Sequence, residues 1–127
     1  MTTENANAAL DRLIAFLAEA REINPVMPAQ ELHVLLLVAA SRRGTSHRRI
    51  AEDSDLSRPS VSRNLNALGT SHRNGKAGHG LVAQVPDPHD MKAALVFLTA
   101  RGRDVVRKLL EAATGEPAVS FSPPTVR

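Results

Sequence analysis

Residues 56–68, LSRPSVSRNLNAL, carry side chains that can bind an anion or a nucleobase. A helix is expected here because Ser57 can cap its N-terminus and Pro59 fits its first turn. Three aliphatic residues spaced four and three apart form one stripe that is expected to be buried. Acids and lysine, which usually occupy a solvated helix face, are absent from the polar side. That side instead carries Arg58, Ser60, Ser62, Arg63, Asn64 and Asn66.

These residue types suit the major groove of duplex DNA. Arginine can donate two hydrogen bonds to guanine, asparagine can pair with the edge of adenine, and small residues allow a close approach. Phosphate repels acids, which accounts for their absence from this face. The alternative is an ordinary polar helix that lacks acids by chance. We expect Pro59, Ser60, Arg63 and Asn66 to face bases, with Ser62 and Asn64 on the groove walls.

The residues before this helix complete a helix-turn-helix. Thr45 is expected to cap a short helix, and Asp55 stands at the turn because Asp tolerates the left-handed conformation. Residues 42–76 hold eight Arg and Lys against three Asp and Glu, although the whole chain has a net charge of only +3. A basic block of this kind indicates a polyanion partner. The remaining expected DNA contacts, mainly at phosphates or in the minor groove, are Thr45, Ser46, Arg48, Ser57, Arg58, Arg73, Lys76 and Lys92.

The elements around the helix-turn-helix predict a fold. Residues 81–98 read as two alternating strands with a turn between them, and Thr99 is expected to cap a last helix over 99–114. An amphipathic helix over 8–23 and a strongly apolar helix over 29–41 come first. This order predicts a winged helix-turn-helix, a mostly α fold with a small β-hairpin wing.

From about residue 29 to residue 110 the chain resembles the multiple-antibiotic-resistance regulator (MarR) family. RRIAEDSDLSRPSVSRNLNAL carries part of the resemblance, and a wing pattern, DP-x-D followed by LT-x-x-G, carries its most specific part. The resemblance implies a dimeric transcription factor whose recognition helix, 58–68, enters the major groove. It also implies that the wing tip, 86–92, reaches the minor groove and that the terminal helices dimerise. The wing pattern consists of Asp87, Pro88, Asp90, Leu98, Thr99 and Gly102.

Three features depart from the pattern of that family. Lys92 stands where the family usually has a wing arginine, and lysine lacks the arginine fork. The glycine-rich segment 69–80 is longer than the family's link, and the C-terminal helix region is short. We expect this segment to contact phosphates through its cations. The alternatives are a disordered loop or a metal site of His72, His79 and His89, whose spacing matches no standard zinc motif.

The first helix is expected to mediate dimerisation. Its apolar residues cover about half of the helical wheel, which is wide for a helix that packs on one neighbour. The same arc could instead wrap around the core of its own domain. The residues expected to meet a second subunit are Leu13, Phe16, Leu17 and Ala20.

Composition excludes several classes of function. The absence of cysteine rules out a disulfide framework and thiol chemistry and fits a reducing cytoplasm. We expect no signal segment, because the first residues carry no basic region, and we expect no membrane-spanning run. No catalytic triad order, buried carboxylate pair or P-loop can be placed, so we expect no enzyme, no cofactor and no metal. Residues 1–115 are expected to form one domain, and residues 116–127 a disordered tail.

The sequence therefore predicts a cytoplasmic, dimeric transcriptional regulator that binds double-stranded DNA sequence-specifically. Within nucleic-acid binding, the alternative is an accessory factor of replication, partition or transposition on a mobile element. From another class, the alternative is a protein-interaction winged helix whose basic face docks an acidic partner. The sequence identifies neither an operator nor a small-molecule effector.

Overall fold

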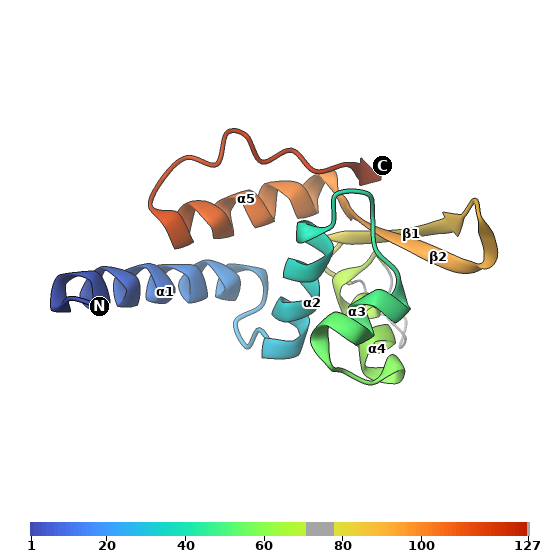
Figure 1. Ribbon diagram of the computed structural model, residues 1–127, viewed down its shortest axis with the longest axis horizontal. Coiled ribbons are helices and arrows are strands. Elements are labelled where there is room, and N and C mark those ends of the chain that lie inside the picture. The colour runs from blue at the N-terminus through green and yellow to red at the C-terminus, as the bar shows by residue number, and fades with distance from the viewer. Residues whose placement is uncertain (71–77, 127) are drawn as a thin grey trace.

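The computed structural model describes residues 1–70 and 78–126, and its elements follow the predicted order (Figure 1). The helix-turn-helix and the antiparallel hairpin confirm the winged helix-turn-helix fold. The elements are α1 (Thr3–Ile23), α2 (Ala29–Ala40), α3 (His47–Ser54), α4 (Arg58–Leu68), β1 (Val82–Asp87), β2 (Asp90–Thr99), α5 (Ala100–Thr114) and β3 (Thr125–Val126).

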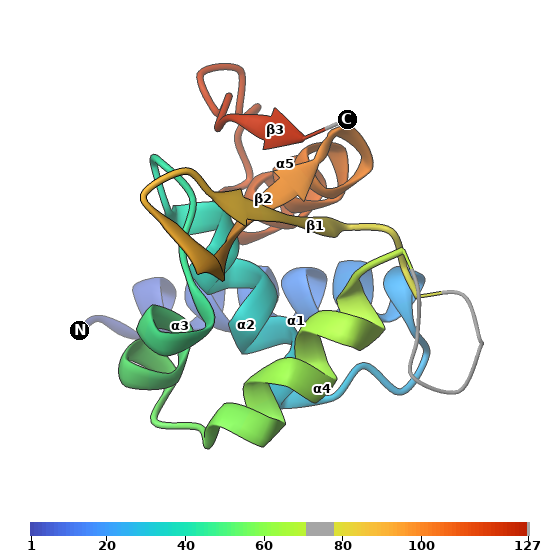
Figure 2. The same cartoon turned by 90° about the vertical axis from the view of Figure 1, so that its right-hand side faces the viewer.

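Helix α2 lies at the centre of the molecule. It contacts α3, α4, α5 and β2, and Figure 2 shows it enclosed by the helix-turn-helix and the hairpin. Val34 and Leu35 are fully buried because this helix is apolar on nearly every side. The aliphatic stripe of α4, formed by Val61, Leu65 and Leu68, is buried against the same core. The polar side of α4 is thereby directed away from the core.

The bounds of α4 match the sequence prediction. Ser57 caps the helix, and its Oγ accepts a hydrogen bond from the Ser60 N–H at 3.2 Å. Pro59 lies in the first turn, where its missing N–H costs nothing. Asp55 ends α3 in the left-handed conformation, with φ of 61°, so the turn between the two helices is as tight as expected.

The two strands of the hairpin are longer, and its turn is shorter, than the sequence indicated. Pairing runs from Val82 opposite Leu98 to Asp87 opposite Asp90, with an irregularity after Pro86. The carboxylate of Asp87 accepts a hydrogen bond from the His89 N–H at 2.9 Å. An aspartate that accepts a hydrogen bond from the N–H two residues later can take the place of a backbone carbonyl in a turn, so the chain reverses at residues 88 and 89. Most of the expected wing tip, 86–92, is therefore strand.

The wing and α5 meet without a linker. Thr99 is the last residue of β2 and also the N-cap of α5, and its Oγ1 accepts a hydrogen bond from the Gly102 N–H at 3.0 Å. The Thr99 hydroxyl donates to the Gly80 carbonyl at 2.6 Å, and its N–H donates to the Leu81 carbonyl at 2.9 Å. A Cβ at Gly102 would collide with the Leu81 carbonyl, so only glycine permits this close approach.

Two expected helix starts were wrong. Helix α1 begins at Thr3, five residues before the expected start, and the Thr2 side chain caps it by accepting from the Asn5 N–H at 3.1 Å. Helix α3 is capped by Ser46 and not by Thr45. Thr45 is only 9% exposed, and its backbone pairs with Val96 of β2. The hairpin therefore uses the residue that the sequence assigned to the helix cap.

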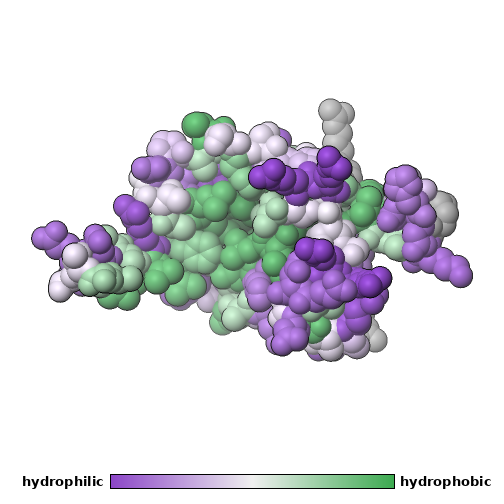
Figure 3. All heavy atoms as spheres, viewed as in Figure 1, coloured by the Kyte–Doolittle hydropathy of each residue, from purple (hydrophilic) through white to green (hydrophobic). Residues whose placement is uncertain are grey.

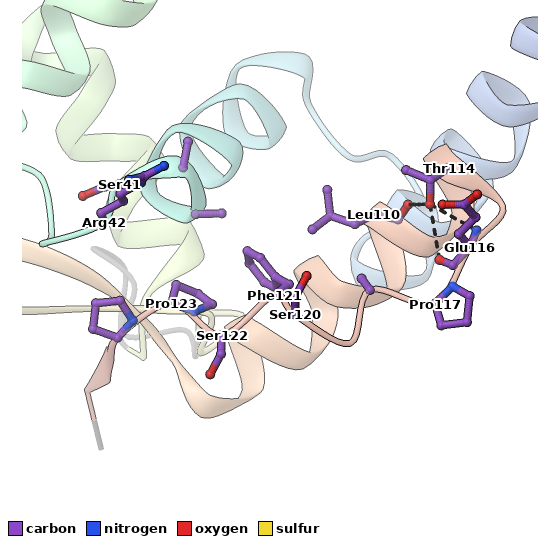
Figure 4. A pocket seen from close by; sticks show the side chains of 14 residues that line it. Ser41, Arg42, Leu110, Thr114, Glu116, Pro117, Ser120, Phe121, Ser122 and Pro123 are labelled. Atoms are coloured by element: carbon purple, nitrogen blue, oxygen red, sulfur yellow. Dashed lines mark hydrogen bonds between the residues drawn. The ribbon is translucent and has the colours of Figure 1, made fainter.

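The chain after α5 packs against the domain up to residue 126, which differs from the expected disordered tail. Phe121 packs on the core, and Arg107 donates a hydrogen bond to its carbonyl at 3.3 Å. Residues Thr125 and Val126 pair with the end of β2 in parallel. Between this segment, α5 and the end of α2 lies a recess of about 720 Å³, where Phe121 and Leu110 project (Figure 4). No expected DNA contact lines this recess.

Candidate nucleic-acid interface

The outward side of α4 collects the side chains expected to read bases. Arg58, Pro59 and Arg63 are exposed, whereas Ser60 and Asn66 are half-buried. No acid occurs on this helix, so nothing on it repels a phosphate backbone. The structure thus presents the expected face to solvent as one continuous helical surface.

Hydrogen bonds within α4 order several of these side chains. Arg63 Nη2 donates to Ser60 Oγ at 2.9 Å, and the Ser57 hydroxyl donates to the same oxygen at 3.0 Å. Asn64 Nδ2 donates to the Ser60 carbonyl at 2.9 Å, so this amide is already engaged with the helix backbone. Arg63 is therefore held along the outer surface of the helix, while Asn64 has less freedom to reach a base.

A groove separates the helix-turn-helix from the wing and gathers several expected phosphate contacts. Its volume is about 570 Å³, and residues of α3, α4, β1 and β2 line it. We call it the wing groove, and it is lined by Ser46, His47, Arg48, Arg58, Asp87, Asp90, Lys92, Ala93 and Ala94.

The cations of the wing groove differ in their availability. Within the described part of the chain, neither Arg58 nor Lys92 forms an ion pair, whereas Arg48 Nε lies 3.1 Å from a carboxylate oxygen of Glu52. That pair is exposed, at 80% and 55%, so it contributes little stability and can exchange for a phosphate. Ser46 is the N-cap of α3, which places the positive end of this helix at the groove.

His47 joins the two sides of the interface, although the sequence analysis did not single it out. Its Nε2 lies 2.7 Å from Gln84 Oε1 on β1, and its Nδ1 lies 3.4 Å from Ser62 Oγ on α4. These partners are 37 and 15 residues away, so no local spacing could reveal them. The position of His47 directly after the cap could not mark it either, because the sequence analysis assigned the cap to Thr45 and not to Ser46.

The expected dimerisation residues separate into two groups. Leu13 and Leu17 are 58% and 55% exposed, and Leu10 and Ile14 extend the same apolar surface along α1. The other two, Phe16 and Ala20, pack on the domain's own core. Figure 3 shows apolar residues along and beside α1, whereas hydrophilic residues cover the helix-turn-helix end. One part of the apolar arc of α1 thus packs on the core, and another part is exposed to solvent.

The glycine-rich segment is only partly described. Arg73 and Lys76, the expected phosphate contacts, lie outside the described residues, as does His72 of the alternative metal site. In the described ranges, no group of three or more potential metal ligands occurs. His79, at the end of the segment, lies 3.6 Å from the Glu31 carboxylate of α2. None of the helices in the described ranges has the length and apolar character needed to cross a membrane.

Comparison with known proteins finds relatives by structure. No family model matches the sequence, and no curated protein matches it either. The PcaV transcriptional regulator from Streptomyces coelicolor, solved with its natural ligand, is 29% identical with a TM-score of 0.53. The match covers 65% of this chain and 52% of PcaV, so the chain spans about half of that protein's length.

Two further solved structures cover more of the chain. The transcriptional repressor CouR, bound to a 23-mer DNA duplex, is 25% identical with a TM-score of 0.60, over 92% of this chain and 75% of CouR. MarR itself, at 15% identity and a TM-score of 0.58 over 86% of this chain and 72% of MarR, supports the fold alone. Together with the wing pattern and the geometry above, these likenesses show that the chain has the winged helix-turn-helix fold of MarR-family transcriptional regulators, which it resembles in sequence as well.

Proposed function

We propose that this protein is a homodimeric transcriptional regulator that binds double-stranded DNA sequence-specifically. The observation that carries the proposal is the outward face of α4, which is free of acids and lies beside the wing groove, where three cations outnumber two acids. The likeness to CouR, a repressor solved on a DNA duplex, supports the same function. The protein acts by binding, and we assign no catalytic role to any of its residues.

Base recognition is assigned to α4 in the major groove. Arg63 is exposed on the outer surface and can leave Ser60 to donate two hydrogen bonds to guanine. Pro59, Ser60 and Asn66 lie on the same side, where small or amide side chains permit close approach. Ser62 and Asn64 line the flanks of the helix.

Backbone positioning is assigned to the wing groove. Arg58 and Lys92 approach it from α4 and β2, and Ser46 and Arg48 approach it from the start of α3. Such contacts neutralise phosphates and fix the register of the protein on the duplex without reading sequence. Thr45 has no place in this set because it is buried against β2.

Dimerisation is assigned to the exposed apolar surface of α1. Four large aliphatic side chains, each more than half exposed on one helix, favour contact with another apolar surface. In a two-fold dimer the preferred site is a near-palindrome with half-sites about one helical turn apart. Leu13 and Leu17 are the proposed centre of this contact.

Selection of binding sites from a random duplex library tests the DNA-binding proposal. We expect an enriched near-palindrome that binds the purified protein more tightly than a scrambled duplex of the same composition. Survivors without any shared sequence would overturn sequence-specific recognition. Weak, sequence-independent binding would favour the protein-interaction alternative instead.

Sedimentation tests the proposed dimer. Wild-type protein is expected to sediment as a dimer at micromolar concentration, and replacement of Leu13 and Leu17 by Glu is expected to yield folded monomers. Val119→Glu is the matched control because Val119 is 88% exposed and lies outside α1. A wild-type monomer, both free and on DNA, would refute the assignment.

A further inference from the structure

We propose that His47 is a positioning residue that fixes the recognition helix α4 relative to the wing by holding Ser62 and Gln84 at the same time. The inference rests on the proposed function, since it concerns how two DNA-binding elements are kept in register. Neither the sequence nor the comparisons assign a role to this residue.

The chemistry of the three side chains defines one arrangement. The amide oxygen Oε1 of Gln84 can only accept, so the His47 Nε2 at 2.7 Å must carry the hydrogen and donate it. In the neutral imidazole, Nδ1 is then free to accept from the Ser62 hydroxyl, whose oxygen lies 3.4 Å away. One ring therefore bridges α4 and β1 while being anchored in the first turn of α3.

The position of the bridge along α4 determines how it adds to the other contacts between this helix and the wing. The C-terminal end of α4 is already tied to the root of the wing: Leu81 N–H donates to the Leu68 carbonyl at 2.7 Å, and Gly80 N–H donates to the Gly69 carbonyl at 2.8 Å. The buried stripe holds α4 against the core, whereas these hydrogen bonds tie the C-terminal end of the helix to the wing. Ser62 lies six residues before Leu68, which is about 9 Å along the helix axis, so the His47 bridge supplies a second fixed point.

A second fixed point matters because α4 and the wing are assigned to different grooves of the same duplex. Binding sites work when their contact groups are held within about 0.5 Å of the productive geometry. Loss of the bridge leaves the caps, the core and the backbone contacts in place. Its loss is therefore expected to lower affinity for the preferred site without unfolding the protein.

A double-mutant cycle distinguishes positioning from direct DNA contact. His47→Ala and Gln84→Ala are each expected to weaken binding to the preferred duplex by about 2- to 10-fold, the range of a single net hydrogen bond. The double variant is expected to lose no more than the larger of the two, because both changes break the same bridge. Multiplying losses would show that the two residues act independently and would overturn the proposal.

Two further measurements exclude the other roles. If His47 binds phosphate as a cation, its removal flattens the slope of log affinity against log salt by about 0.9, whereas a bridge leaves the slope unchanged. His47→Gln, which keeps a long side chain with an N–H donor, is expected to restore part of the affinity that His47→Ala loses. A flattened slope, or a lowered unfolding midpoint in both variants, would refute the positioning role.

Nitrogen NMR of the DNA-free protein tests the bridge independently of the proposed function. We expect the His47 ring in the Nε2–H tautomer, with an Nε2 resonance that shifts in Gln84→Ala. The Nδ1–H tautomer, or a resonance unaffected by Gln84→Ala, would overturn the bridge even in a protein that reads DNA as proposed. Wild-type protein without sequence preference, in contrast, would remove the proposed function, and the positioning role would fall with it.

Discussion

Removal of the two unpaired cations of the wing groove should change the salt dependence of DNA binding by a calculable amount. Arg58 and Lys92 approach the groove from α4 and β2, and neither forms an ion pair within the described residues, although Asp87 and Asp90 line the same groove. Each phosphate contact that releases counterions contributes about 0.9 to the slope of log affinity against log salt. Arg58→Ala and Lys92→Ala are therefore each expected to flatten the slope by about 0.9, and together by about 1.8.

The same slope predicts how strongly each contact makes the affinity depend on salt. Across a fourfold change in salt, one contact accounts for about a 3.5-fold change in affinity, and two contacts for about 12-fold. Arg48 is expected to contribute less than Arg58, because it must first leave Glu52. Glu52→Gln releases Arg48 and removes a nearby negative charge, so this variant should bind DNA more tightly than the wild type.

Fluorescence anisotropy of a labelled duplex, titrated at several salt concentrations, measures these slopes. Lys108→Ala is the control, because Lys108 is an exposed cation on α5 that does not line the groove. The ratio of affinities for matched and scrambled duplexes should be unchanged, since phosphate contacts carry no sequence information. If both groove variants keep the wild-type slope while Lys108→Ala lowers it, the DNA lies on another face and the assigned interface is wrong.

Three other predictions concern single features of the interface. Arg63→Ala should cost about 1–3 kcal/mol of binding free energy on the preferred duplex, with a smaller effect on scrambled DNA; equal losses on both would identify a phosphate contact instead. Ser57→Ala removes the cap of α4 and should lower the free energy of unfolding by about 1 kcal/mol in a urea titration, while an unchanged midpoint would mean that the hydrogen bond to Ser60 is dispensable. Replacement of Arg73 and Lys76 by Ala, which lie outside the described residues, should flatten the salt slope by up to about 1.8 and leave base preference intact. An unchanged slope would indicate that the glycine-rich segment 69–80 does not contact DNA.

The helix-turn-helix was predictable because its signals are local. Ser57, Pro59 and Asp55 each act through the backbone conformation within a turn of themselves, so their types and spacing specify where α4 begins and how sharply the chain turns. The buried stripe then determines which side of the helix faces solvent. The acid-free composition of that side gave the functional prediction.

Features that depend on contacts between residues far apart in the chain could not be predicted from the sequence. Thr45 and Ser46 are both residues that can cap a helix, and the backbone pairing of Thr45 with Val96 leaves the cap to Ser46. The polar segment after α5 carries no periodic signal, and its position depends on Phe121, which packs on the core, and on contacts with α5 and β2. His47 was missed for the same reason, since its two partners lie in other elements.

Thr99, which belongs to both the wing and α5, has a consequence for which DNA sites a dimer of this protein would accept. Because Thr99 both ends β2 and caps α5, and Gly102 packs directly on Leu81, the wing has no hinge that would let it turn independently of α5. Helix α5 in turn packs along α1, which bears the proposed dimer contact. In a dimer, the packing of these helices would therefore set the separation of the two wings. Substitutions there, far from any nucleotide, are expected to change which half-site spacing the protein accepts.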